Sequence, residues 1–102
     1  AQLRSGNETI QRSAFHQGLA DPSGEVRAAA LLGLHGVDPQ GSREELVNGL
    51  KDADGNVRLA ALDIMGEGPE AESQLRKALN DPDELVRELA RMRLGLPESI
   101  DN

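Results

Sequence analysis

The chain has 102 residues, a formal net charge of −7 and no cysteine, so disulfides, thiolate catalysis and cysteine metal sites are excluded. Its length corresponds to one domain, and its longest apolar run, residues 28–34, is far shorter than the ~20 residues of a membrane-spanning helix. Leucine and alanine supply most of the apolar residues and Phe15 is the sole aromatic. This mixture favours closely packed helices over β-strands.

The negative charge is unevenly distributed along the chain. Residues 1–34 and 86–102 are balanced, and the whole excess lies between Asp38 and Glu84. An acidic segment repels phosphate backbones, so nucleic-acid binding is disfavoured. We interpret the acidic middle either as a solvated surface that aids solubility or as a surface for a basic partner.

One sequence pattern occurs three times. It is anchored at Val26, Val57 and Val86, which lie roughly 30 residues apart. Self-similarity at this period is typical of stacked helical repeats, in which each unit buries its apolar face against its neighbour. The predicted repeats cover about residues 5–36, 42–66 and 69–95, followed by a short tail over residues 96–102.

The first helix of each repeat, the A helix, is indicated by its starting residues. Ser5-x-x-Glu8 and Ser42-x-x-Glu45 are capping boxes, in which the serine and the glutamate bond to backbone N–H groups at the start of a helix. Gly68-Pro69 breaks the chain before the third A helix. The predicted A helices cover about residues 5–19, 42–50 and 70–79.

The second helix of each repeat, the B helix, carries the valine anchor. Asp21, Asp52 and Asp81 are predicted to be the N-caps of these helices, with Pro22 at a first helical position where its missing N–H costs nothing. Gly36 is predicted to end the first B helix. The predicted B helices cover about residues 21–35, 52–66 and 81–95.

Apolar residues in the second B helix recur at positions i, i+3, i+4, i+7 and i+8, which form one face of a helix. They are Val57, Ala60, Ala61, Ile64 and Met65. The sequence therefore predicts an all-α fold of three stacked helix pairs.

The pattern Asp-Pro-x-x-x-Val-Arg-x-Ala-Ala, preceded two positions earlier by leucine, resembles the HEAT repeat. The resemblance covers about residues 10–95, and the short period is similar to that of phycobilin lyases and many bacterial scaffold proteins. It implies a right-handed α–α superhelix, a solenoid of three HEAT-like helix pairs. It also implies that the B helices line the concave side, where such stacks bind partners.

An aspartate precedes an arginine by six positions in every repeat. One interpretation is a row of guanidinium groups for an anionic ligand. The favoured one is a structural ladder, in which each arginine reaches a carboxylate or carbonyl in its own or a neighbouring repeat. The HEAT resemblance implies the same kind of ladder. The residues are Asp21 with Arg27, Asp52 with Arg58, and Asp81 with Arg87.

No catalytic site, metal site or cofactor is predicted. Residues 52–56 superficially resemble a calcium loop, but the sixth position, which must be glycine, is Val57. HEAT-like iron enzymes use His-Glu dipeptides, whereas this chain has His16-Gln17 and His35-Gly36. HEAT-like DNA glycosylases need a basic surface with aromatic residues, and this chain has an acidic middle without Trp or Tyr.

A strip of the B helices opposite the valine anchors is the predicted partner surface. Leu59 lies between polar neighbours and is the leading candidate for an exposed apolar anchor. The alternative is that Leu59 and Leu62 pack against adjacent B helices. The strip comprises Ala28, Leu31, His35, Leu59, Leu62, Asp63, Glu88, Arg91 and Met92.

These features predict a non-enzymatic scaffold that binds a protein or peptide. The alternative is an accessory subunit resembling phycobilin lyases, which attaches or chaperones a chromophore. The sequence does not determine the compartment. A cytoplasmic protein is slightly favoured, and the Ala1-Gln2 start also fits an exported mature chain.

The sequence of the last B helix indicates the oligomeric state. Arg91 and Arg93 stand where the preceding B helix has Leu62 and Ile64. This exchange indicates a polar cap that closes the stack, so we expect a monomer.

Overall fold

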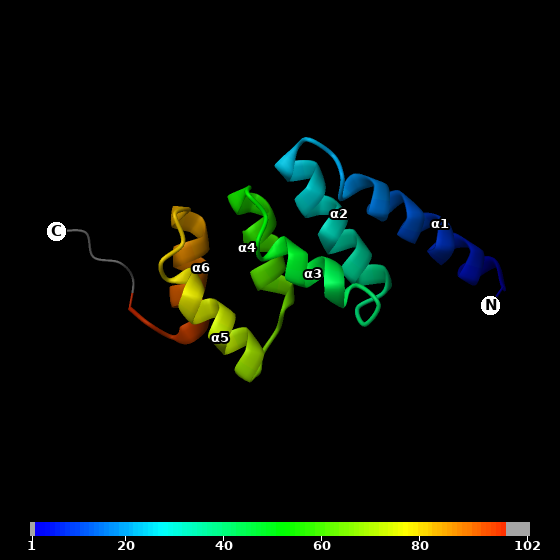
Figure 1. Ribbon diagram of the computed structural model, residues 1–102. Coiled ribbons are helices and arrows are strands. Elements are labelled where there is room, and N and C mark those ends of the chain that lie inside the picture. The colour runs from blue at the N-terminus through cyan, green and yellow to red at the C-terminus, as the bar shows by residue number, and fades with distance from the viewer. Residues whose placement is uncertain (1, 98–102) are drawn as a thin grey trace.

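The computed structural model describes residues 2–97, with side chains from residue 7 onward. The described chain consists of six α-helices and contains no strand (Figure 1), which confirms the predicted all-α fold. In chain order the helices are α1 (Gln2–Gly18), α2 (Gly24–Val37), α3 (Arg43–Gly49), α4 (Gly55–Ile64), α5 (Pro69–Ala78) and α6 (Glu84–Leu94).

The helices form two layers of unequal spacing in an elongated molecule of 56 × 30 × 17 Å. The B helices α2, α4 and α6 pack against one another in sequence. The A helices α1, α3 and α5 each pack on the B helix that follows, and within the described residues their backbones stay apart from one another. An exposed ion pair between Arg43 and Glu70 joins α3 to α5. A stack curves toward its tighter layer, so the B helices lie on the inner side and the A helices are splayed on the outer side.

The core lies between successive repeats. One cluster of buried side chains contains Leu31, Val57 and Ala61, and a second contains Leu62, Leu75, Ala78, Val86 and Ala90. Each leucine or valine that is fully buried stabilises the fold by roughly 1.5–3 kcal/mol. The alanines allow neighbouring B helices to approach closely, so the apolar surface of one repeat is covered by the next.

The three aspartates predicted as N-caps lie two residues too early. The carboxylates of Asp21, Asp52 and Asp81 each accept a 2.8 Å hydrogen bond from the backbone N–H two residues later. This local bond forms a turn ahead of the helix, so the helix begins later and Pro22 precedes the cap. The N-caps are Ser23, Asp54 and Asp83.

Two further helix boundaries differ from the prediction, and one predicted capping bond is not formed. The helix α1 begins at Gln2 rather than at Ser5, because serine is only weakly unfavourable inside a helix. The helix α2 continues through Gly36 to Val37, since a single glycine costs a helix only about 1 kcal/mol. Ser42 occupies the N-cap position of α3, but its side chain makes no capping bond there.

Two glycines lie at helix ends, as expected. Gly68, with φ of +120°, precedes Pro69, the first residue of α5. Gly95, with φ of +73°, adopts the left-handed conformation that ends α6. Residues 96 and 97 are not helical, and the rest of the predicted tail, residues 98–102, lies outside the described residues.

Two other glycines let successive B helices meet at their first turns. A Cβ atom on Gly24 would lie 1.9 Å from Oδ2 of Asp54, the N-cap of α4. A Cβ atom on Gly55 would lie 2.2 Å from Oδ2 of Asp83, the N-cap of α6. Glu84 occupies the corresponding position in α6, where no following repeat packs within the described residues.

Substitution of Gly55 by alanine is therefore expected to destabilise the protein, although alanine is the better helix former. The added methyl group would displace the Asp83 cap, and such overpacking typically costs about 1–3 kcal/mol. The matched control is Gly36→Ala, where a Cβ atom meets nothing within 4 Å. This control should stabilise the protein by about 0.5–1 kcal/mol. Urea unfolding of both variants measures the two changes, and a stabilised Gly55→Ala protein would contradict the packing argument.

Candidate interaction surfaces

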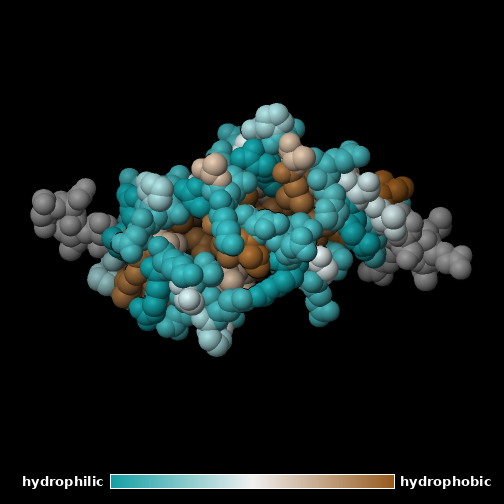
Figure 2. Space-filling view, viewed as in Figure 1, coloured by the Kyte–Doolittle hydropathy of each residue, from teal (hydrophilic) through white to brown (hydrophobic). Residues whose placement is uncertain are grey.

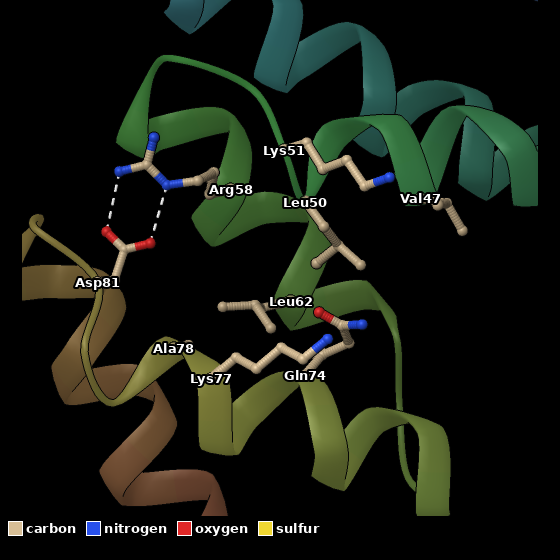
Figure 3. Close-up of a pocket in the computed structure, with 9 residues that line it drawn as sticks. All are labelled: Val47, Leu50, Lys51, Arg58, Leu62, Gln74, Lys77, Ala78 and Asp81. Carbon is tan, nitrogen blue, oxygen red and sulfur yellow. Dashed lines mark hydrogen bonds and ion pairs between the residues drawn. The ribbon is translucent and has the colours of Figure 1, made fainter.

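A ladder of arginine–aspartate pairs connects successive repeats. Nε and Nη2 of Arg27 donate to the two carboxylate oxygens of Asp52 at 3.1 and 2.9 Å. Arg58 donates to Asp81 in the same way, at 2.9 Å for both bonds (Figure 3). Two parallel bonds between a planar guanidinium and a carboxylate fix orientation as well as distance.

The same arginines also close the turn of their own repeat. Nη1 of Arg27 donates to the carbonyl oxygen of Asp21 at 2.8 Å, and Nη1 of Arg58 to that of Asp52 at 2.8 Å. Arg87 bonds the carbonyl oxygen of Asp81 at 2.7 Å. Arg27 and Arg58 are thus committed to contacts within the protein, which leaves them unavailable as a row of sites for an anionic ligand.

The ladder carboxylates are more acidic than ordinary aspartates. The hydrogen bonds from Arg58 lower the pKa of Asp81 against the opposing effect of partial burial, and Arg27 does the same for Asp52. The pKa of each arginine is raised in turn by its aspartate. The side chains of Arg58 and Asp81 are only 15% and 12% exposed, so water screens this pair less than an ion pair on the surface.

An apolar groove of about 500 Å³ crosses the B layer. Its apolar lining comes from α2, α4 and α6, and consists of Ala28, Ala29, Leu32, Leu59, Ala60 and Leu89. Glu25, Asn56 and Asp63 also line it. The groove therefore combines an apolar lining with two carboxylates and contains no lysine or arginine.

Comparison with known families identifies the repeats. A family model for HEAT repeats matches residues 12–95, which include the five helices α2 to α6 and the C-terminal part of α1. The chain belongs to the HEAT-repeat family. HEAT repeats commonly mediate protein–protein interactions. Comparisons with curated proteins and with solved structures gave no match.

The described part of this HEAT-repeat chain contains neither a membrane-spanning helix nor a cluster of metal ligands. None of its helices is both long enough and apolar enough to cross a membrane. No three histidine, aspartate or glutamate side chains among the described residues lie together in a way that could hold a metal ion.

Three residues of the predicted partner strip lie together in the groove of the HEAT stack: Ala28, Leu59 and Asp63. His35 is half-buried and lies outside the groove. The remaining part of the strip that is not buried lines a separate depression of about 400 Å³ at α6, together with Gly95 and Leu96. That part consists of Glu88, Arg91 and Met92.

Leu31 and Leu62 were wrongly placed on the partner surface. Their exposed fractions are 0% and 3%, because each packs into the cluster between its own repeat and the next. A helix in the middle of a stack is covered on several sides, so its buried arc is wider than one apolar stripe. The prediction that Leu62 packs against adjacent helices is the one that agrees with its burial.

Sequence reasoning missed Leu32, which is 44% exposed in the groove. The signal was present in the repeat register. Leu32 follows Val26 by the same six positions that separate Asp63 from Val57, and Asp63 was assigned to the strip. Leu89 was also missed, since it belongs to the groove only because α6 packs beside α4.

Arg93 has a different role from the predicted polar end cap. Its guanidinium donates to the carbonyl oxygens of Asp63 and Gly66, at 3.3 and 2.6 Å, and so points back toward the preceding repeat. Arg91 pairs with Glu88 on the same helix at 3.3 Å. The monomeric state stays a prediction.

Replacement of Arg58 by alanine is expected to lower the free energy of unfolding by about 2 kcal/mol, since hydrogen bonds to charged groups contribute about 1.5–3 kcal/mol. For a domain of this size that corresponds to a fall in melting temperature of roughly 8–16 °C. The control is Arg76→Ala, whose ion pair with Glu72 is exposed and is worth only about 0.5 kcal/mol. Thermal unfolding followed by circular dichroism compares them, and equal shifts would contradict a special role for the ladder.

The ladder should also make stability depend on acid pH. Because folding lowers the pKa of Asp52 and Asp81, their contribution is complete above the pKa of the unfolded chain and is lost as pH falls below about 4. In Arg58→Ala, Asp81 loses its partner and the fall should be shallower. Urea unfolding of both proteins between pH 6 and pH 3 measures this difference. A constant stability gap between them would contradict the assignment.

Proposed function

We propose that this protein is a non-enzymatic interaction module that holds a segment of a partner protein in the groove of the B layer. The observation that carries the proposal is one apolar groove shared by three B helices, α2, α4 and α6. Membership of the HEAT-repeat family supports a protein as the partner, because HEAT repeats commonly mediate protein–protein interactions.

The lining of the groove indicates the chemistry of the partner. Leu32 and Leu59 offer apolar surface, and burial of such surface against a partner drives association. Glu25 and Asp63 lie beside it and favour lysine or arginine near the docked apolar side chain. The partner segment is therefore expected to combine leucine-like side chains with basic residues.

The groove is wide enough for side chains from a helix or an extended segment. Its volume of about 500 Å³ lies within the ~300–1,000 Å³ of ligand pockets. Leu59 is half-buried and also packs against the core cluster formed by Leu62 and Val86. Leu32 is 44% exposed, so its substitution tests binding with the smaller effect on folding.

The test is a titration of the protein with a blocked amphipathic peptide of leucine and lysine, followed by calorimetry. Leu32→Glu should weaken binding at least tenfold, because it places a charge in the apolar part of the groove. Ile10→Glu is the control, since Ile10 is an equally apolar residue that is 69% exposed on α1, outside the groove.

A second pair of variants tests the acidic residues. Glu25→Lys and Asp63→Lys should each weaken binding of the same peptide, with the effect reduced by salt. No binding by the wild type, or equal weakening by Leu32→Glu and Ile10→Glu, would count against the B-layer groove. A partner captured from cell lysate by the wild type and lost with Leu32→Glu would then identify the natural ligand.

A further inference from the structure

The outer face of the stack contains a cleft that the proposed function does not use. It lies between α3 and α5, whose backbones stay apart, and has a volume of about 280 Å³. Leu50, Leu62 and Ala78 supply apolar lining. Figure 2 shows apolar side chains at the bottom of a hollow in the middle of this face, with hydrophilic residues around it.

The only two lysines of the chain, Lys51 and Lys77, line this cleft from opposite sides. Figure 3 shows Lys51 just beyond Leu50, the C-cap of α3, and Lys77 on α5, with the side chains of Leu50 and Leu62 between them. Both lysines are exposed, and neither side-chain ammonium group makes a hydrogen bond or an ion pair with the described residues. Every arginine whose side chain is described has at least one such partner. The two lysines differ from these arginines because their ammonium groups are unpaired within the described residues.

The charge of the cleft is not cancelled by its own acidic residue. Asp81 is the one carboxylate that lines it, and both oxygens of Asp81 accept hydrogen bonds from Arg58. That pair is neutral as a unit. Lys51 and Lys77 therefore give the cleft a net positive charge. The cleft nevertheless lies within residues 38–84, the segment that carries the whole acidic excess.

The preceding repeat provides an internal comparison. The cleft between α1 and α3, of about 180 Å³, is built from equivalent positions, with Leu19 and Leu31 where the α3–α5 cleft has Leu50 and Leu62. Both clefts contain a ladder pair. The polar residues differ, because Glu45 and Asn48 stand where the α3–α5 cleft has Gln74 and Lys77. The same architecture is thus acidic in one copy and basic in the other.

We propose that the α3–α5 cleft is a second docking site, which binds an acidic segment of a partner protein. An aliphatic side chain of that segment rests on the half-buried Leu50, and its neighbouring carboxylates pair with Lys51 and Lys77. Charge complementarity selects this occupant, since a basic segment would be repelled here and favoured in the groove of the opposite face. The cleft is smaller than the ~300–1,000 Å³ of most ligand pockets, which suits one side chain better than a large cofactor.

The test is a titration of the full chain, labelled with ¹⁵N, with a blocked peptide of leucine and glutamate at physiological ionic strength. Saturable amide shifts are expected at Val47, Lys51, Lys77 and Ala78. The amides of Leu19 and Leu31, which line the α1–α3 cleft, should not shift. A matched peptide of leucine and glutamine should bind at least tenfold more weakly, because it lacks the carboxylates.

Charge-reversal variants compare the two lysines of the cleft with a neighbouring arginine outside it. Lys77→Glu and Lys51→Glu should each weaken binding of the leucine–glutamate peptide at least fivefold. Arg76→Glu makes the same change of charge on α5 but lies outside the cleft, and should weaken binding less than twofold. The dispersion of each spectrum shows that the variant is folded.

Three results would overturn the proposal: no shifts at millimolar peptide, shifts spread over the whole surface, or equal weakening by Arg76→Glu and Lys77→Glu. Leu32→Glu leaves this cleft intact, so it should bind the acidic peptide like the wild type. Failure of one docking site can therefore be distinguished from failure of the other.

Discussion

The paired hydrogen bonds between an arginine of one repeat and an aspartate of the next are the contact on which the stack depends. Arg58 illustrates this, because one guanidinium holds the carbonyl of Asp52 in its own turn and both carboxylate oxygens of Asp81 in the next. Asp81 in turn accepts the N–H of Asp83, the cap of α6. The position of one B helix is thus coupled directly to the start of the next B helix.

This contact also sets the spacing of the two layers. The turns that it joins lie at the start of the B helices, where Gly24 and Gly55 allow close approach. The A helices have no comparable buried contact. Their backbones remain apart in the described chain, and the ion pair that joins Arg43 of α3 to Glu70 of α5 is exposed. The tight layer buries the apolar clusters that stabilise the fold, and the open layer leaves clefts between α1 and α3 and between α3 and α5.

The two proposals assign opposite chemistry to the two faces. The inner groove presents leucine and alanine beside Glu25 and Asp63, whereas the outer cleft presents Leu50 between Lys51 and Lys77. A protein with these surfaces could hold a basic segment on one side and an acidic segment on the other. Because the surfaces lie on different layers, both partners could bind at once, as suits a scaffold.

The amino-acid sequence by itself determined the three repeats, the all-α fold and the residues of the ladder, since these follow from local propensity and a pattern that recurs. Tertiary structure decided which side chains of a B helix stay exposed. Leu31 and Leu32 are adjacent and equally apolar, yet one is buried and the other lies in the groove. It also brought Lys51 and Lys77 to one cleft. Such outcomes depend on how far neighbouring helices stand apart, and that distance is set by contacts between repeats rather than by any single segment.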